Sequence, residues 1–305
     1  MASSERGSII LGSVTAICVV FFWSGWIVIS RLGVTGHLTI FDLTGLRHGI
    51  GAVVALPYII WSRAWRGLTP WRTLILTLTA GAPYALLSYS GFIYAPAAHG
   101  GVFLNGCLPI FTTLFAWIWL GQRSRFSQMG GLVIILAGVT LVGYEGFLSS
   151  GGSMTWIGDL LFLAAIALFA LFMVANQVWS VNPGQVIFSI TIVPAVVYTP
   201  IWLLWLDSNL TSAPAAEIIL QGAYQGLVPS VVGISCLNIA VRHIGPRATS
   251  ALVSSVPVVA ALAAIPVLNE LPGLPAWIGM IAVTLGILLA LGIIGFYQQT
   301  PAANE

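Results

Sequence analysis

The sequence predicts an all-α integral membrane protein with ten transmembrane helices, arranged as two inverted five-helix repeats around a central cavity. Its composition, ten long apolar runs and an internal repeat support this prediction. Of the 305 residues, 58% are apolar and only 6% are charged, whereas a soluble domain carries roughly 25% charged residues to hydrate its surface. A chain this poor in charge cannot cover itself with a hydrated surface, so most of its exterior must face lipid.

Ten apolar runs are candidates to cross a hydrocarbon layer of about 30 Å, which takes roughly 20 helical residues, and the fifth of them is short. They lie at 8–30, 40–61, 74–94, 102–120, 129–144, 156–178, 186–206, 218–241, 249–268 and 276–296. The first run carries Phe22, Trp23 and Trp26 where a cleaved signal peptide would need small residues. We therefore expect this run to be retained as a helix.

The arginines predict how the helices are oriented, because cytoplasmic loops carry an excess of positive residues. With a cytoplasmic N-terminus, the inner side receives eight of the ten cations: Arg6, Arg63, Arg66, Arg72, Arg123, Arg125, Arg242 and Arg247. Only Arg31 and Arg47 fall on the outer side. Both termini are thus expected in the cytoplasm, which requires an even number of spans.

The chain divides into two similar halves, expected at 1–149 and 150–305. A shift of 148 residues places Pro109 on Pro257, Leu120 on Leu268, Gly131 on Gly279 and Gly138 on Gly286, and a shift of 143 places Pro57 on Pro200. Five spans per half is an odd number, so the second half must enter the membrane in the opposite direction. Inverted repeats of this kind are typical of secondary transporters, whose substrate site lies near the midplane between the halves.

Pro109 and Pro257 occupy matching places in the two halves. A proline inside a helix frees a backbone carbonyl and favours a kink. Membrane helices tolerate such kinks and pack around them. The two prolines are therefore either packed kinks or a symmetric pair of hinges, one for each gate of an alternating-access cycle.

Several functions are disfavoured by what the sequence lacks. Its three cysteines lie in apolar runs without paired spacing and are expected to be small buried hydrophobes. No group of side chains has metal-ligand spacing, no Walker-type loop predicts ATP use, and no basic run predicts nucleic-acid binding. We expect no cofactor, no metal and no catalytic residues; an intramembrane enzyme and a non-transporting scaffold are the rival classes.

Arg47 lies a turn or two inside the second run. Charged groups within spans are costly and usually face the protein interior or a water-filled cavity. A long arginine can also extend its charged end to the membrane surface. Arg47 therefore either pairs with Asp42 or a helix end near the outer surface, or faces the cavity and meets a substrate carboxylate.

The third run carries Tyr84, Ser88 and Gly91 on one helical face. Such a polar stripe is typical of a cavity-lining helix, and the alternative is a seam of interhelical hydrogen bonds. Tyr89 and Tyr94 fall on other faces, where we expect them to pack or to anchor the helix at the interface. No carboxylate falls near the middle of a predicted span, which favours a facilitator over a proton antiporter.

Trp23 and Trp26 lie deep in the first run, whereas interfacial tryptophans lie at span ends. Their indole N–H groups need partners, so we expect both to face the cavity. Asn105 and Asn238 either join helices or contact the substrate. His99 is either a hydrogen-bonded structural residue or takes part in gating or proton coupling. The candidate substrate-binding residues are thus Trp23, Trp26, Arg47, Tyr84, Ser88, Asn105 and Asn238.

Short motifs follow one another in order along the whole chain: Phe22-Trp23-Ser24-Gly25 with Arg31, Arg47, Leu108-Pro109 with Leu120-Gly121-Gln122, Gly131, Gly138, Gly158-Asp159, Val256-Pro257 with Leu268-Asn269-Glu270, Gly279 and Gly286. Together these motifs resemble the EamA branch of the drug/metabolite transporter superfamily. Two positions depart from the family pattern: Gln122 replaces an acid and Asn269 replaces a glycine. The departures affect charge-based roles at these sites and leave the expected fold unchanged.

Within this family the chain is most similar to the YddG-type exporters, which carry aromatic and other amino acids out of bacteria. The resemblance implies a small-molecule exporter of the bacterial inner membrane that works without ATP; other small metabolites or drugs are the alternative cargo. The Gly45-xxx-Gly49 and Gly222-xxx-Gly226 spacings allow close helix packing. We assign them to packing within one bundle, so we expect a monomer surrounded by lipid.

Overall fold

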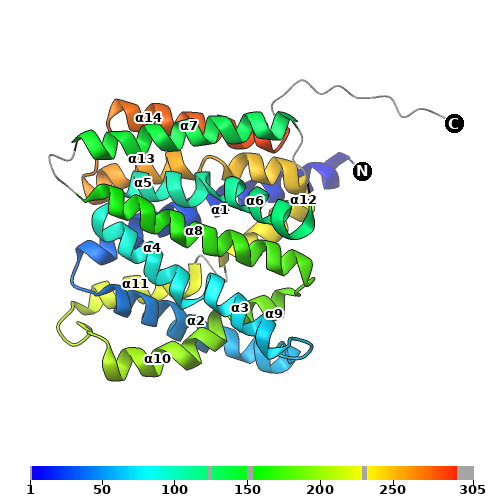
Figure 1. The fold of residues 1–305 in the computed structure, drawn as a ribbon. Helices are drawn as coiled ribbons and strands as arrows, with labels where there is room; N and C mark the ends of the chain where they lie inside the picture. Colours follow the sequence, from blue (N-terminus) through cyan, green and yellow to red (C-terminus); the bar gives the residue numbers. More distant parts are fainter. Residues whose placement is uncertain (1, 123–125, 150–153, 229–231, 294–305) are drawn as a thin grey trace.

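The computed structural model describes residues 2–122, 126–149, 154–228 and 232–293, and the regular structure in these residues is helical. In chain order, the helices are α1 (Ala2–Thr35), α2 (Ile40–Ser62), α3 (Pro70–Ala80), α4 (Ala82–Tyr94), α5 (Ala97–Gly101), η1 (Val102–Gly106), α6 (Leu108–Leu120), α7 (Phe126–Ser149), α8 (Thr155–Val178), α9 (Pro183–Ile187), η2 (Phe188–Ile192), α10 (Val193–Trp205), α11 (Ala215–Leu227), α12 (Gly233–Val253), α13 (Val256–Leu268) and α14 (Leu274–Ala290). They form a bundle whose long helices run roughly along one direction (Figure 1).

Six described segments are long and apolar enough to cross a membrane: Gly7–Thr35, Ile40–Ser62, Ala97–Leu120, Gln128–Phe147, Thr155–Val178 and Pro183–Trp205. A bent pair, Ser235–Val253 and Val256–Leu268, adds a seventh if it is counted as one span. The other predicted spans are shorter or interrupted; Gly81, for example, separates α3 from α4. The protein is therefore a multi-pass membrane protein, and the count of ten spans stays a prediction.

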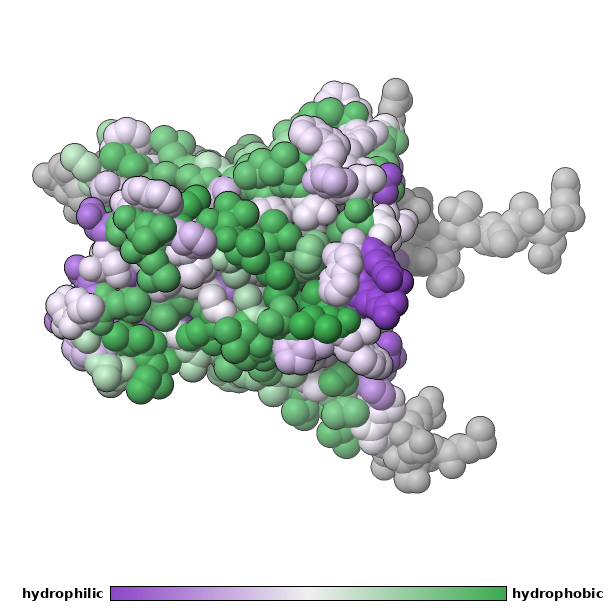
Figure 2. All heavy atoms as spheres, turned by 90° about the horizontal axis from the view of Figure 1, so that it is seen from below, coloured by the Kyte–Doolittle hydropathy of each residue, from purple (hydrophilic) through white to green (hydrophobic). Residues whose placement is uncertain are grey.

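Polar residues gather at two opposite ends of the bundle, and apolar side chains cover the surface between them (Figure 2). One end, here called the acidic end, contains the connections after α1, α10 and α13, with Asp42, Asp207, Glu217 and Glu270. The other, the arginine end, contains the α2–α3 connection with Arg63 and Arg66, the start of α3 with Arg72, and the arginines of α12. This pattern matches an apolar belt between two hydrated ends.

Helices α7 and α14 run antiparallel along a seam of glycines. A Cβ atom at Gly138 would lie 2.6 Å from the Gly279 carbonyl oxygen, and one at Gly286 would lie 2.9 Å from the Gly131 carbonyl oxygen. Small residues let membrane helices approach this closely, and backbone packing then holds them together. The repeat alignment pairs Gly131 with Gly279 and Gly138 with Gly286. In the structure the contacts are crossed, because Gly131 packs against Gly286 and Gly138 packs against Gly279.

Matching breaks precede the two aligned prolines. Pro109 is the second residue of α6, which follows η1 and Cys107, and Pro257 is the second residue of α13, which follows a turn at Ser254 and Ser255. The prolines thus begin helices rather than interrupt them, and a proline there loses no intrahelical hydrogen bond. Whether the two breaks act as hinges stays a prediction.

Three of the four glycines in the Gly-xxx-Gly spacings make close contacts inside the bundle, namely Gly45, Gly222 and Gly226. An added Cβ at Gly45 would overlap the Trp202 ring, and one at Gly226 would lie 2.9 Å from the Ile50 side chain. Gly49 has no atom within 4 Å of such a Cβ. Three helices, α2, α10 and α11, therefore meet closely on these small residues, as assigned from the sequence.

We expect Gly131→Ala to destabilise the protein, because the new Cβ would lie 2.4 Å from the Ala290 amide nitrogen and force α7 from α14. A forced backbone shift costs about 1–3 kcal/mol. Gly130→Ala is the matched control, since its nearest neighbour lies 3.8 Å away. Melting temperatures in detergent micelles measure the difference, and equal values for the two variants would contradict the seam.

Candidate substrate-binding site

Where α1, α2 and α4 meet, a cation lies over one ring of an aromatic cluster. The guanidinium carbon of Arg47 lies 5.6 Å from the centroid of the Trp26 ring. Trp26 stacks on Tyr84, with centroids 6.5 Å apart, and Tyr84 lies 5.2 Å from Phe169 of α8. A cation over an indole face is attracted by the ring quadrupole, so the rings hold Arg47 inside the bundle.

Two buried donors at this place have no hydrogen-bond partner among the described residues, namely Trp26 Nε1 and Arg47 NH1. An unmade hydrogen bond of a buried donor costs about 1–3 kcal/mol, and more when the donor is charged. Guanidinium groups match planar carboxylates through paired N–H donors. The arrangement can therefore accept a carboxylate beside an aromatic wall.

The alternative in which Arg47 pairs with Asp42 is wrong. Asp42 is wholly buried, and its carboxylate accepts hydrogen bonds from Trp202 Nε1 at 3.0 Å, Ser208 Oγ at 2.6 Å and the Asn209 amide at 3.0 Å. It also caps α2 through the Thr39 amide. Its acceptors are thus occupied by the connection after α10, which leaves Arg47 to the aromatic cluster.

Tyr89 belongs to this site, although the helical period places it away from the predicted stripe. It is wholly buried, and its hydroxyl donates a hydrogen bond to Gln225 Oε1 at 2.9 Å. The side chains of Arg47 and Trp26 both approach that hydroxyl. The available sequence signal was the pair of amides Gln221 and Gln225, one turn apart in an otherwise apolar segment.

The predicted site residues are only partly brought together. Trp26, Arg47 and Tyr84 converge, and Ser88 is buried one turn from Tyr84, with its hydroxyl donating to the Tyr84 carbonyl at 2.9 Å. Trp23 is half-buried, and its indole nitrogen lies beside Gly233 at the start of α12.

The two asparagines lie elsewhere. Asn105 donates through Nδ2 to the Gly101 carbonyl at 3.2 Å, within its own helical segment, and Asn238 is exposed on α12. Neither makes a described contact with Arg47 or Trp26. Their predicted role in substrate binding is untested.

His99 lies in α5 and pairs with Asp159 of α8, with Nδ1 and Oδ1 2.8 Å apart and both side chains buried. The imidazole also stacks on Phe103. A 450 Å³ cavity at the acidic end is lined by His99, Glu145 and Glu270 among others. His99 is therefore a hydrogen-bonded residue of the core. Its role in gating or proton coupling stays a prediction.

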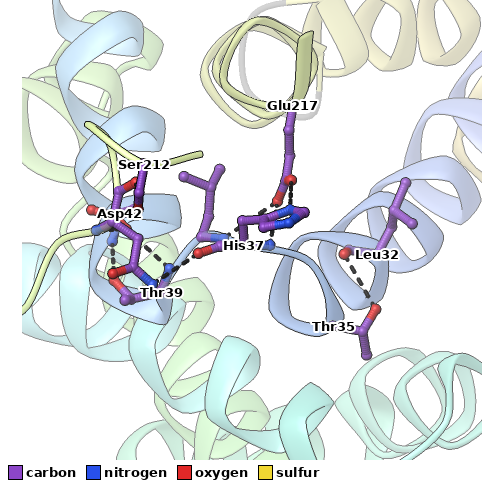
Figure 3. A network of polar contacts seen from close by, with 9 residues as sticks. Leu32, Thr35, His37, Thr39, Asp42, Ser212 and Glu217 are labelled. Carbon is purple, nitrogen blue, oxygen red and sulfur yellow. Dashed lines mark hydrogen bonds and ion pairs between the residues drawn. The ribbon is translucent and has the colours of Figure 1, made fainter. Parts of the chain in front are cut away.

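Polar contacts join the two halves at the acidic end. Arg31 of α1 forms an ion pair with Glu270 at 2.7 Å. His37 faces Glu217 of α11 at 2.9 Å (Figure 3). Glu270 also accepts from the Ala97 amide at 2.7 Å. Together with the Asp42 contacts, these bonds tie α1 and α2 to segments of the second half.

The arginine end contains a polar cavity of about 320 Å³ between α6, α7 and α8. It is lined by Thr112, Thr113, Ala116, Gln122, Gln128, Met173, Val174 and Gln177. Amides and hydroxyls supply the polar lining, and Gln128 Nε2 donates to Thr113 Oγ1 at 3.3 Å. This cavity offers neutral donors and acceptors, in contrast to the charged contacts of the acidic end.

The helical bundle, its apolar belt and its buried polar site are those of a membrane transporter. The model of the EamA-like transporter family matches residues 10–144 and again residues 156–292. The chain therefore belongs to the EamA-like transporter family and contains two copies of the family's domain.

Two further comparisons agree with this assignment. A curated relative from Streptantibioticus cattleyicolor, named as a probable terminal-alkyne amino-acid exporter, is 24% identical over 223 residues, which cover 69% of each chain. A solved crystal structure superposes with a TM-score of 0.63 and 17% identity, covering 95% of this chain and 99% of that chain. The superposition shows that the two chains share a fold.

We expect Asp42→Asn to destabilise the protein by about 2–3 kcal/mol, because hydrogen bonds to a charged group are worth about 1.5–3 kcal/mol. Each carboxylate oxygen accepts two donors, so an amide nitrogen in either place would face donors only. Asp207→Asn, at an exposed residue, should change stability by less than about 0.5 kcal/mol. Thermal melts of both variants test this, and equal melts would argue against the role of Asp42.

Proposed function

We propose that the protein is a secondary transporter that exports amino acids, with aromatic and other apolar ones favoured, by alternating access and without ATP. The observation that carries the proposal is the pair of unpartnered donors, Trp26 Nε1 and Arg47 NH1, inside an aromatic cluster. An amino-acid carboxylate satisfies both donors. The contiguous rings of Trp26, Tyr84 and Phe169 supply an aromatic surface for an apolar side chain.

The relative named as an amino-acid exporter supports this substrate class. Other small metabolites or drugs with an anionic group are the second candidate, since the unpartnered donors recognise the anion rather than the α-amino group. A transport panel that includes amino acids, sugars and cationic drugs separates these classes.

Ten spans in two inverted five-helix repeats are the architecture that we propose for the cycle. The antiparallel glycine seam supports it, because Gly131 opposes Gly286 and Gly138 opposes Gly279. The matched helix breaks before Pro109 and Pro257 supply one bend in each half. The excess of arginine supports a cytoplasmic location for that end in a bacterial inner membrane. The residues of the proposed site all come from one chain, which supports a monomer.

The two ends differ in how they are closed. The family copies begin at residues 10 and 156, which aligns Arg31 with Gln177, and the repeat shift of 148 aligns Glu270 with Gln122. Both glutamines line the cavity at the arginine end. The ion pair that joins the halves at the acidic end thus has a neutral counterpart at the arginine end, which favours a resting state closed to the outside.

Proteoliposomes containing the protein are expected to move labelled L-phenylalanine without ATP. Arg47→Gln should raise the KM for phenylalanine roughly 10–100-fold, because a charge-assisted hydrogen bond is worth about 1.5–3 kcal/mol. Arg47→Lys keeps the charge but loses the paired donors, so it should fall between. Transport of phenethylamine, which lacks the carboxylate, should not be weakened by either change.

No flux of any amino acid above that of protein-free vesicles would overturn amino-acid export. Flux of another solute in the same panel would then support the second candidate. Imposing and collapsing a pH gradient across the vesicles decides between a facilitator and a proton-coupled carrier.

Arg31→Gln should shift the protein towards a state closed at the arginine end. A cysteine introduced at Thr113, in a background without the three native cysteines, reports access to that cavity through its rate of maleimide labelling. A partly exposed ion pair contributes up to about 1 kcal/mol, so labelling should slow by about two- to fivefold. Arg63→Gln changes an exposed residue at the opposite end and is the control. Identical labelling rates in the two variants would show that the Arg31–Glu270 ion pair does not hold the acidic end closed.

A further inference from the structure

Two glutamines are buried within α11 at its contacts with α1 and α4. Gln221 and Gln225 lie one turn apart and are wholly buried. Neutral amides in this position are costly unless their donors and acceptors are bonded. Their hydrogen bonds form a chain that ends at the hydroxyl of Tyr89, next to Arg47.

The direction of every bond in this chain is fixed by chemistry. Gln221 Nε2 donates to the Ile29 carbonyl at 2.8 Å, and a carbonyl can only accept. Gln221 Oε1 therefore accepts from Gln225 Nε2 at 3.1 Å, and the same nitrogen donates to Ser30 Oγ at 3.1 Å. Gln225 Oε1 is left as an acceptor and takes the proton of Tyr89 at 2.9 Å.

Tyr89 has one hydroxyl proton, and Gln225 receives it. The Tyr89 oxygen then has only lone pairs to present to the side chains of Arg47 and Trp26 that approach it. Among the described residues, the Trp26 Nε1 and Arg47 NH1 donors themselves make no hydrogen bond, so Tyr89 orients them and leaves them open to an anion. This acceptor is neutral, so it orients the guanidinium without cancelling its charge. A carboxylate in its place would form an ion pair with Arg47 and compete with the substrate.

We infer that Gln221 and Gln225 are positioning residues which, through Tyr89, hold Arg47 as an oriented but uncompensated cation and so give the site its preference for carboxylate-bearing solutes. The inference rests on the proposed function, because it explains how the proposed site selects an amino acid over the corresponding amine. It also explains why neutral amides, rather than glutamates, occupy these two buried places.

Tyr89→Phe and Gln225→Glu test the inference in the full-length protein reconstituted in liposomes. Tyr89→Phe removes the acceptor and should raise the KM for L-phenylalanine about tenfold, with the maximal rate within about twofold. Gln225→Glu introduces a competing carboxylate and should reduce the preference for phenylalanine over phenethylamine by at least tenfold. Tyr94→Phe makes the same change at an exposed residue of the same helix and should leave both values unchanged.

A double-variant cycle separates positioning from a merely structural role. If Tyr89 acts through Arg47, Tyr89→Phe should have no further effect on the KM in an Arg47→Gln background. Additive effects on the KM would overturn the inference, as would a Tyr89→Phe variant with the selectivity of the unmodified protein.

The failure of the proposed function would be seen separately, as absence of phenylalanine transport by the unmodified protein. The contact between Tyr89 and Arg47 is then tested by the melting temperatures of the two single variants and the double variant. Coupled shifts for Tyr89→Phe and Arg47→Gln support the contact between the two residues, and independent shifts overturn it.

Discussion

A guanidinium held over an indole ring is the interaction on which the interior of this protein depends. An arginine at the centre of a spanning helix costs about 2.5–3.5 kcal/mol on insertion, and Arg47 lies two turns from the end of α2, where the cost is smaller. A cation–π contact returns about 0.5–2 kcal/mol, so the contact between Arg47 and Trp26 offsets part of that cost. Among the described residues no ion pair includes Arg47. The positive charge of Arg47 is therefore not neutralised by a carboxylate among the described residues, and it can attract an anion.

The frame around this site is built from glycine contacts and charged ends. Glycines bring α7 and α14 into backbone contact, where lipid gives no hydrophobic drive for helices to associate and close packing must supply it. The buried carboxylate of Asp42 and the Arg31–Glu270 ion pair hold the acidic end. The asymmetry of the two ends follows from where the acids lie, since the aligned positions at the arginine end are glutamines.

The sequence was sufficient to predict features that depend on the composition and on repeated patterns along the whole chain. Composition predicted a membrane protein, and the paired glycines and prolines predicted an internal repeat. In the structure these glycines form the contact between α7 and α14, and the prolines follow matching helix breaks. Side-chain partners were harder to predict. The nearest acid in sequence to Arg47 is Asp42, but that carboxylate is taken by Trp202 and the connection after α10. Tyr89 was expected to pack or to anchor the helix, and it is buried, but helical period identifies only a face and could not predict its partner Gln225, which lies 136 residues away.

The position of the site along its helices ties it to the acidic end. Trp26 and Arg31 are five residues apart on α1, and Asp42 and Arg47 are five residues apart on α2, which is roughly 7.5 Å along a helix. Each helix therefore carries one side of the aromatic site and one contact of the acidic end. Any motion that separates Arg31 from Glu270, or Asp42 from Ser208, must act on helices that also carry Trp26 and Arg47. In the proposed cycle, opening the acidic end and releasing a bound anion are then parts of one rearrangement.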